Sequence, residues 1–275
     1  MKKFLTSAAA LLLSVFVSAA TLEKVSVRSE AMNKDVNVVV VAPDGAKAAE
    51  GTRFPVVYLL HGYSGNEDTW VQVKPELPAL ADLYGIIFVC PDGQNSWYFD
   101  SPIDPKVRYE TFVSNELIGF VDRNYRTIAS REGRAVTGLS MGGHGAMWLS
   151  LRHKDVFGAA GTTSGGVDIR PFPENWEIKR VIGELSSDGR SWDDYTVVNL
   201  VDGLENGELA LIVDCGYDDF FFDVNLDLHE RLRAKGIDHD YLVRPGVHNG
   251  PYWTNSIDYQ ILFFKKYFDR VAGKQ

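Results

Sequence analysis

Short apolar runs alternate along the chain with longer stretches whose apolar residues recur at helical spacing. A short continuous apolar run between turn residues is typical of a strand that is buried on both faces of a parallel sheet. The pattern predicts strands at residues 24–28, 33–42, 54–60, 86–90, 134–137, 158–163, 209–213 and 239–243.

Helical periodicity fills most of the intervals between these runs. It predicts helices over residues 109–125, 143–153, 223–235 and 253–271, and a partly helical stretch at 67–84 that Pro75 and Pro78 interrupt. Strands that alternate with helices indicate an α/β fold, with a mostly parallel central sheet and helices on both of its faces.

Two stretches follow neither pattern. Residues 94–106 predict a long loop rich in aromatic and polar side chains, and residues 165–207 contain scattered prolines, glycines and tryptophans. We expect the second stretch to be a small, irregular, cap-like insertion. The chain has 275 residues, of which 45% are hydrophobic, and this is enough for one large core. Residues 21–275 are therefore interpreted as a single domain.

The first 20 residues differ from the rest of the chain. Lys2 and Lys3 precede an apolar and small-residue run at 4–17, and the small residues at 17–20 match a cleavage site. This order is typical of a secretory signal peptide, and the run is too short to span a bilayer comfortably. We interpret residues 1–20 as a signal peptide, with a membrane anchor as the alternative. The expected product is secreted or periplasmic and has no membrane span.

Charge and cysteine content narrow the function classes. The formal net charge is −9 at pH 7, so no positive field exists to attract nucleic acid. Cys90 and Cys215 each end a different predicted strand, and both are expected to be buried and free unless those strands are neighbours. No histidine or cysteine pair has metal-ligand spacing and no glycine-rich phosphate loop occurs, so neither a metal nor a cofactor is predicted.

The sequence Gly138-Leu139-Ser140-Met141-Gly142 lies between a predicted strand and a predicted helix. A serine between two such glycines is typical of a nucleophile elbow, a sharp turn that projects the hydroxyl away from the sheet. The pattern also arises by chance. A catalytic role for Ser140 therefore depends on a base and an acid elsewhere in the chain.

His248 is the predicted base. A serine hydroxyl needs a base that accepts its proton, and the base needs an acid that fixes its tautomer. His248 follows the last predicted strand in a loop rich in proline and glycine, where the backbone can direct its ring toward the serine. The other histidines downstream of the serine lie on predicted helices or a strand and are expected to be structural: His144, His153, His229 and His239.

The acid is expected in the turn at 214–219, after the preceding strand. Spacing favours Asp219, which lies three residues after Gly216. Asp218 and Asp214 are the alternatives, and Asp214 could instead stabilise the turn by accepting backbone hydrogen bonds.

Ester cleavage places negative charge on the carbonyl oxygen, which requires preorganised donors. The sequence offers the backbone amides of Met141, directly after the serine, and Tyr63, in the loop that contains His61. His61 is expected to hold this loop. Four aromatic residues in loops are candidate substrate contacts, because a flat apolar wall suits an aryl acid or a sugar face. They are Trp97, Tyr98, Trp176 and Trp253, and packing between loops is the alternative role for each.

Five motifs, in this order, resemble the esterase D-like group of serine esterases. They are Leu60-His61-Gly62-Tyr63-Ser64-Gly65-Asn66, Pro91-Asp92-Gly93 with Asn95-Ser96-Trp97-Tyr98, Gly138-Leu139-Ser140-Met141-Gly142-Gly143, Asp214-Cys215-Gly216 with Asp219-Phe220, and Pro245-Gly246-Val247-His248. The group includes S-formylglutathione hydrolases, tributyrin esterases, and the feruloyl and acetyl-xylan esterases of carbohydrate esterase family one.

The resemblance spans about residues 23–268. It implies an α/β-hydrolase fold in which Ser140, Asp219 and His248 form the catalytic triad and Tyr63 and Met141 supply the oxyanion amides. The group commonly has Gly-Gly-His at the last motif, where this chain has a valine before the histidine.

The predicted function is that of an exported serine carboxylesterase. It would hydrolyse short-chain acyl or aryl esters, including acetyl or feruloyl esters of polysaccharides, through an acyl-enzyme on Ser140. The expected partner is a small-molecule or carbohydrate ester. The alternatives are an acyltransferase to a sugar or lipid alcohol, a non-catalytic glycan-binding protein on the same fold, and a peptidase. An export signal disfavours a cytosolic glutathione thioester as the substrate.

Overall fold

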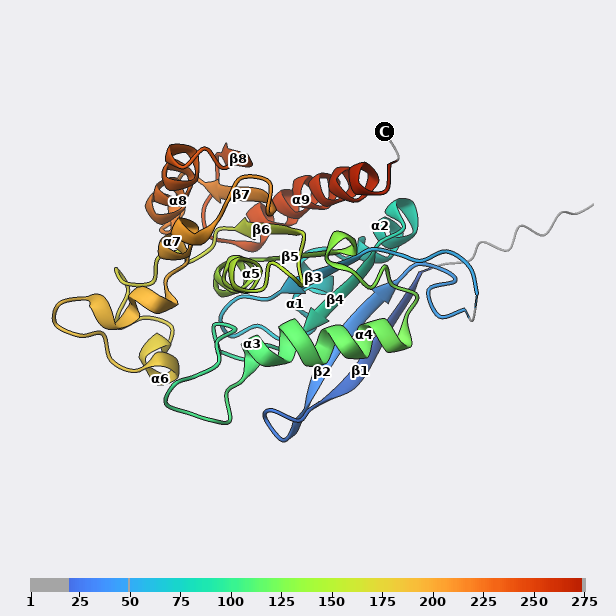
Figure 1. Cartoon of the computed structure of the whole chain (residues 1–275), viewed down its shortest axis with the longest axis horizontal. Helices are drawn as coiled ribbons and strands as arrows, with labels where there is room; N and C mark the ends of the chain where they lie inside the picture. The colour runs from blue at the N-terminus through green and yellow to red at the C-terminus, as the bar shows by residue number, and fades with distance from the viewer. Residues whose placement is uncertain (1–19, 49, 274–275) are drawn as a thin grey trace, which may run out of the picture.

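The computed structural model describes residues 20–48 and 50–273. Eight strands of this part of the chain form one sheet in the order β1-β2-β4-β3-β5-β6-β7-β8 (Figure 1). The strands are β1 (Thr21–Ser29), β2 (Lys34–Ala42), β3 (Val56–Leu60), β4 (Ile87–Pro91), β5 (Arg134–Gly138), β6 (Ala159–Thr163), β7 (Ala210–Gly216) and β8 (His239–Arg244). All eight strands predicted from the apolar runs are confirmed.

The sheet is mostly parallel. Strand β2 pairs antiparallel with both β1 and β4, whereas the pairs from β4 through β3, β5, β6 and β7 to β8 are parallel. The carboxyl ends of the parallel strands therefore meet at one edge, which we call the carboxyl edge, and their starts meet at the amino edge. Cys90 on β4 and Cys215 on β7 are separated by three strands, and both are buried and free, as predicted.

Side chains alternate between two apolar layers along each strand. Val56, Tyr58 and Leu60 of β3 face one layer, and Val57 and Leu59 face the other. Helices α3, α4, α5, α7 and α8 cover the first face, and α1, α2 and α9 cover the second, as Figure 1 shows for α4 and α9. The helices are α1 (Thr69–Val73), α2 (Leu77–Tyr84), α3 (Tyr109–Thr111), α4 (Ile118–Asn124), α5 (Met141–Arg152), α6 (Ile178–Ile182), α7 (Val197–Leu200), α8 (Phe222–Ala234) and α9 (Gly250–Val271).

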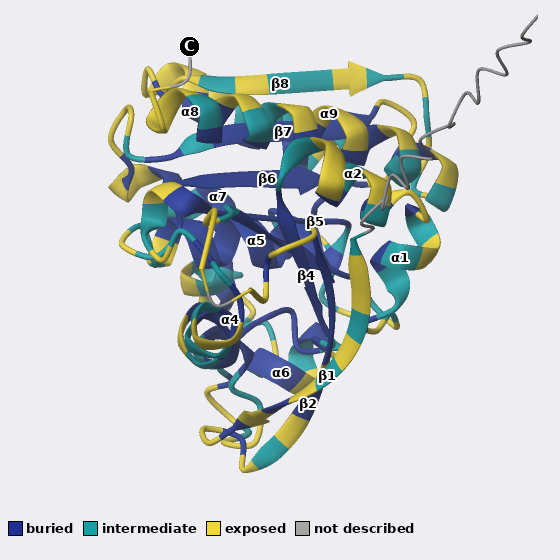
Figure 2. Ribbon diagram, turned by 90° about the vertical axis from the view of Figure 1, so that its right-hand side faces the viewer, coloured by how far each residue is buried: buried dark blue, intermediate teal, exposed yellow. Residues whose placement is uncertain are grey.

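The chain therefore has an α/β-hydrolase architecture, in which β3, β4, β5 and β6 are fully buried and the edge strands β1 and β8 are partly exposed (Figure 2). Two helix predictions need correction. Pro78 does not break a helix, because it lies in the first turn of α2, where a missing N–H costs nothing. Helix α9 begins at Gly250 rather than Trp253, since Pro251 occupies its first turn and the side chain of Asn249 caps Tyr252 N.

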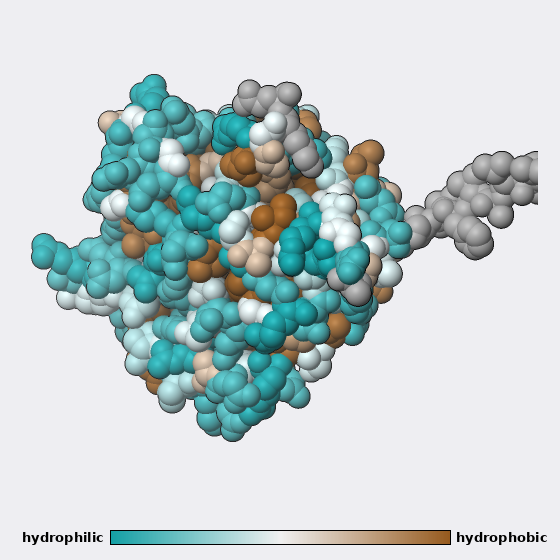
Figure 3. Space-filling view, turned by 45° about the vertical axis from the view of Figure 1, so that its right-hand side comes forward, coloured by the Kyte–Doolittle hydropathy of each residue, from teal (hydrophilic) through white to brown (hydrophobic). Residues whose placement is uncertain are grey.

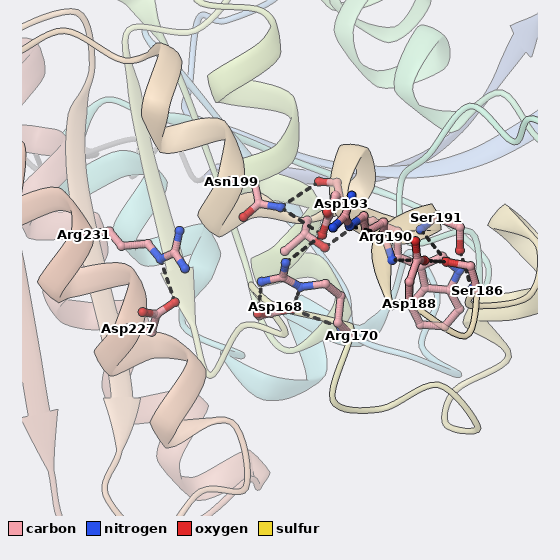
Figure 4. A network of polar contacts seen from close by, with 12 residues as sticks. Asp168, Arg170, Ser186, Asp188, Arg190, Ser191, Asp193, Asn199, Asp227 and Arg231 are labelled. Atoms are coloured by element: carbon pink, nitrogen blue, oxygen red, sulfur yellow. Dashed lines mark hydrogen bonds and ion pairs between the residues drawn. The ribbon is translucent and has the colours of Figure 1, made fainter.

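The segment 165–207 consists of short helices and turns, which Figure 1 shows projecting from the body of the sheet. Its polar side chains bond mainly to one another. The Arg170 guanidinium binds Asp168 and Asp193, each at 2.7 Å, and Asn199 donates to the Asp193 carbonyl (Figure 4). All eight strands lie in one sheet outside this segment, and we propose that residues 21–275 form one domain with 165–207 as its insertion.

No helix in residues 20–48 and 50–273 has the length and apolar character needed to cross a membrane. The face in Figure 3 is mostly hydrophilic, with small hydrophobic patches among polar atoms. The predicted signal peptide at 1–20 lies outside the described residues, apart from Ala20.

Candidate active site

Ser140 occupies a strained turn between β5 and α5. Its backbone has φ 56° and ψ −119°, a conformation that a non-glycine residue holds only when its surroundings enforce it. The flanking glycines make the turn possible. A Cβ at Gly142 would lie 2.2 Å from the carbonyl oxygen of Leu60, and one at Gly138 would lie 2.3 Å from the Gly142 carbonyl carbon. The predicted elbow geometry is therefore present.

His248 lies within hydrogen-bond distance of both Ser140 and Asp219. Its Nε2 is 2.9 Å from Ser140 Oγ, and its Nδ1 is 2.9 Å and 3.0 Å from the two carboxylate oxygens of Asp219. A carboxylate can only accept, so Nδ1 carries the proton and Nε2 is free to accept the serine proton. The Asp219 side chain is fully buried, and the His248 side chain is 14% exposed. This chain of bonds can activate a serine hydroxyl.

The structure separates the three candidate acids. Asp219 is held in place because its Oδ1 also accepts the amide of Phe221 at 2.9 Å. Asp218 is exposed, and the hydrogen bonds of the His248 ring go to Asp219 and Ser140 instead. Asp214 is fully buried, where it accepts the Tyr252 hydroxyl at 2.5 Å and pairs with the Arg244 guanidinium. Asp214 therefore ties β7 to β8 and α9 through side-chain donors, not through the backbone amides that were its alternative partners in the sequence analysis.

The amides of Met141 and Tyr63 lie in the two loops beside Ser140. Met141 is the first residue of α5, so no earlier helical carbonyl accepts its N–H. Tyr63 lies in a turn that the hydrogen bond from Gly65 N to Gly62 O closes, and its amide has no backbone acceptor among the described residues. Both amides are thus available to a ligand oxygen.

Two buried histidines support these loops. His61 contacts Gly62 O through Nδ1 at 2.7 Å and accepts the amide of Gly93 through Nε2 at 2.7 Å. It thereby joins the loop after β3 to the loop after β4, the structural role that the sequence indicated. His144 binds Gly166 O through Nδ1 at 2.9 Å, and burial lowers its pKa to about 4, so it is neutral near pH 7.

A cavity of about 450 Å³ opens above Ser140. Its lining includes Tyr63, Trp176, Phe220 and Trp253, and contains no lysine, arginine, aspartate or glutamate among the described residues. The Trp176 and Phe220 rings are stacked with centroids 5.5 Å apart, and Phe220 lies 4.2 Å from the His248 ring. The arrangement offers an uncharged, aromatic binding surface beside the serine.

Trp97 and Tyr98 do not line this cavity, and the prediction that they contact substrate is corrected. Trp97 is 1% exposed and Tyr98 is fully buried. Trp97 Nε1 donates to Trp176 O at 3.2 Å, and Tyr98 OH donates to His61 O at 3.1 Å. Both residues therefore support the backbone of the loops. Trp176, which Trp97 contacts, lies between Trp97 and the cavity.

Phe220 lines the cavity, but the sequence analysis named it only as part of a motif and not as a substrate contact. Phe220 is 52% exposed, and it directly follows Asp219 in the chain. The available signal was its position next to the predicted acid, where a large apolar residue in a polar turn has no core to occupy. Its exposure at the mouth of the cavity makes it a candidate contact for substrate.

Comparison with known proteins agrees with this geometry. An esterase family model matches residues 29–264. The chain belongs to this family. It is 28% identical over 247 residues to an acetyl esterase of Caldicellulosiruptor saccharolyticus, covering 83% of this chain and 92% of the relative. It is 26% identical over 194 residues to an S-formylglutathione hydrolase of Bos taurus, covering 63% of this chain and 67% of the relative.

Solved structures give the same result. A ferulic acid esterase superposes with a TM-score of 0.77 at 26% identity, covering 90% of this chain and 99% of that one. The resemblance predicted from the five motifs is confirmed. The chain is a carboxylic ester hydrolase of the α/β-hydrolase fold.

Proposed function

We propose that this chain is an exported serine carboxylesterase that cleaves uncharged acyl or aryl esters, including acetyl or feruloyl esters of carbohydrates. The observation that carries the proposal is the chain of bonds from Ser140 Oγ through His248 to Asp219 at the floor of the cavity. The acetyl esterase and ferulic acid esterase relatives support the choice of acyl groups.

In the proposed reaction, Ser140 Oγ attacks the ester carbonyl while His248 Nε2 takes its proton. The carbonyl oxygen becomes an oxyanion that accepts hydrogen bonds from the amides of Tyr63 and Met141. His248 then gives the proton to the departing alcohol, which leaves an acyl group on Ser140. A water molecule, deprotonated by the same histidine, releases the acid and restores the serine. Asp219 stabilises the protonated ring throughout.

Replacement of the nucleophile tests this mechanism. Ser140→Ala should lower kcat for p-nitrophenyl acetate by about 10,000-fold or more, because the attacking oxygen is lost. Ser150→Ala is the matched control, since Ser150 is buried in the same helix and bonds only to Met147 O. Full activity in Ser140→Ala would rule out the mechanism.

The uncharged lining of the cavity favours neutral substrates over glutathione thioesters, whose carboxylates would find no cation there. A kinetic comparison of S-formylglutathione with acetylated and feruloylated oligosaccharides tests this choice. We expect higher kcat/KM for the oligosaccharides, and a clear preference for the thioester would contradict it. Products formed with and without an added alcohol separate hydrolysis from acyl transfer.

Phe220 and Trp176 supply the wall proposed to bind an aryl acyl group. Phe220→Ala should lower kcat/KM for methyl ferulate about 10-fold, because an aromatic contact and its burial are lost. The effect on p-nitrophenyl acetate should stay within about 2-fold. Tyr217→Ala is the control, since Tyr217 is 50% exposed in the same turn but does not line the cavity.

Export is part of the proposal and rests on residues 1–20. Signal cleavage at either small-residue site would leave Ala20 or Thr21 at the amino terminus. Mass spectrometry of the protein recovered outside the cytoplasm measures this directly. Retention of Met1 in that fraction would contradict the signal-peptide interpretation.

A further inference from the structure

Trp176 and Glu177 connect the 165–207 segment to the loops beside Ser140. Both residues have left-handed backbones, with φ 48° and 54°. Two consecutive non-glycine residues in this region are strained, and they persist only where the surroundings fix both side chains. Trp176 lines the cavity, and its carbonyl accepts the Trp97 indole N–H at 3.2 Å.

The Glu177 carboxylate contacts polar side chains from two other loops. It accepts Asn95 Nδ2 at 3.4 Å, it pairs with Arg180, and it lies close enough to the Tyr63 hydroxyl to raise the pKa of that group. The Asn95 side chain extends this set of hydrogen bonds to the oxyanion loop, because its Oδ1 accepts the amide of Ser64 at 2.8 Å. Ser64 is therefore bound through its backbone to one connected set of polar groups, and the hydroxyl of its neighbour Tyr63 interacts with the Glu177 carboxylate of that set.

The segment that carries Glu177 is itself anchored. Arg170 binds Asp168 and Asp193 on either side of it in sequence, as Figure 4 shows. Ile178, directly after Glu177, is fully buried in the main core. A carboxylate fixed in this way can define the position of an aromatic side chain on a neighbouring loop.

We propose that Glu177 is a positioning residue for the oxyanion loop, acting through the Tyr63 hydroxyl and Asn95 to hold the Tyr63 amide toward the reacting oxygen. The inference rests on the proposed function, which gives that amide its role. An oxyanion donor acts only within about 2.7–3.1 Å of the charge that develops. The turn at 62–65 includes Ser64 at φ 59°, so it needs external support to keep the amide in place.

Charge is essential to this arrangement. The Arg180 guanidinium and the Tyr63 hydroxyl lower the pKa of Glu177, so the carboxylate is ionised at neutral pH. Partial burial and the adjacent carboxylate raise the pKa of Tyr63, so its hydroxyl keeps the proton that it donates. A hydrogen bond to a charged acceptor is stronger than a neutral one, and Glu177 therefore outperforms a glutamine at this position.

Two substitutions break the same contact from opposite ends. Tyr63→Phe and Glu177→Gln should each lower kcat about 5- to 20-fold with KM within about 2-fold, because the contact is used mainly in the tetrahedral states. The affinity for a boronic acid that forms a tetrahedral adduct should fall by the same factor. The double variant should lose little more than either single variant, because both remove one interaction. Glu174→Gln is the control, since Glu174 lies on the same segment and pairs only with Lys179.

The outcomes separate the two proposals. If both variants match Glu174→Gln in kcat and boronic acid affinity while Ser140→Ala is inactive, the positioning role is wrong and the esterase mechanism stands. A change in the melting temperature alone, with kcat and boronic acid affinity intact, also overturns the positioning role. If Ser140→Ala is fully active, the proposed function itself fails.

Discussion

The loops at the two edges of the sheet turn in different ways. After β3, β4, β5 and β6, at the carboxyl edge, the described chain places eight non-glycine residues at positive φ, beside the glycines Gly183 and Gly189: Ser64, Gln94, Trp97, Tyr98, Ser140, Ser164, Trp176 and Glu177. Before β3, β4, β7 and β8, at the amino edge, its positive-φ residues are glycines: Gly45, Gly51, Gly85, Gly207 and Gly236. A left-handed non-glycine residue costs about 1–2 kcal/mol, whereas glycine adopts this conformation freely.

The difference in backbone conformation shows at which edge the side chains of the turn residues have a role of their own. At the amino edge the turn only reverses the chain, so a glycine suffices. At the carboxyl edge the residue in the strained position also supplies a group: Ser140 faces His248, Trp176 lines the cavity, and Trp97 holds the Trp176 carbonyl. Strain accumulates where loops must present side chains in fixed directions, which is the edge where parallel sheets bind ligands.

Removal of a carboxylate should have the largest effect, and only at the carboxyl edge. Asp219→Asn should lower kcat by about 1,000- to 10,000-fold, because the amide favours the wrong tautomer of His248. Asp238→Asn, before β8 at the amino edge, removes a carboxylate bonded to Asn206 and should change kcat by less than about 2-fold. Steady-state kinetics on one aryl ester measures both. Equal effects would remove the distinction between the edges.

Alanine substitutions of glycine should also have a larger effect on stability and activity at the carboxyl edge than at the amino edge. Gly142→Ala should destabilise the fold by about 3 kcal/mol and abolish activity, because the new Cβ would meet the Leu60 carbonyl at 2.2 Å. Gly207→Ala has open space around the new Cβ and should cost only about 1–2 kcal/mol for its positive φ, with activity intact. Denaturant unfolding and ester hydrolysis test the pair, and an active Gly142→Ala variant would contradict the tight elbow.

A smaller effect concerns pH. Burial lowers the pKa of His144 to about 4, below the 6.5 of an exposed histidine. Between these values the unfolded chain binds a proton that the folded chain does not, so this residue's contribution to stability falls as the pH decreases and levels off below about 4. The loss should be about 2 kcal/mol between pH 6.5 and pH 5.

The difference between the wild-type chain and His144→Asn in the change of unfolding free energy from pH 6.5 to pH 5 isolates this contribution. His144→Asn should flatten the pH dependence, because asparagine can still donate to Gly166 O but cannot be protonated. His229→Asn should flatten it less, since His229 is only partly buried in α8. An unchanged slope in His144→Asn would show that His144 is not the group that titrates.

The sequence predicted the sheet well because a strand buried on both faces must be apolar throughout, as in Val56–Leu60. It also located Ser140, Asp219 and His248 near one edge, since each follows a strand. The sequence analysis failed for residues whose role depends on the direction in which the side chain points. Trp97 and Phe220 are both aromatic residues in loops, and only three-dimensional packing shows that the first is buried behind the cavity and the second lines it.

Helix boundaries failed for a different reason. Proline excludes a residue from a helix interior but is favoured in the first turn, so Pro78 and Pro251 are ambiguous until the cap is known. The six-residue π-helical stretch Phe112–Leu117 before α4 has the same apolar periodicity as an ordinary helix over so short a length, and periodicity alone does not distinguish the two.

The central claim is that Ser140 is the nucleophile, and covalent trapping tests it most directly. A fluorophosphonate probe incubated with the folded protein should label one site per chain, and peptide mass spectrometry should place the adduct on Ser140. Ser140→Ala should remain unlabelled, and Ser150→Ala should be labelled at the normal rate. An adduct on another residue, or a folded and unlabelled protein, would contradict the account.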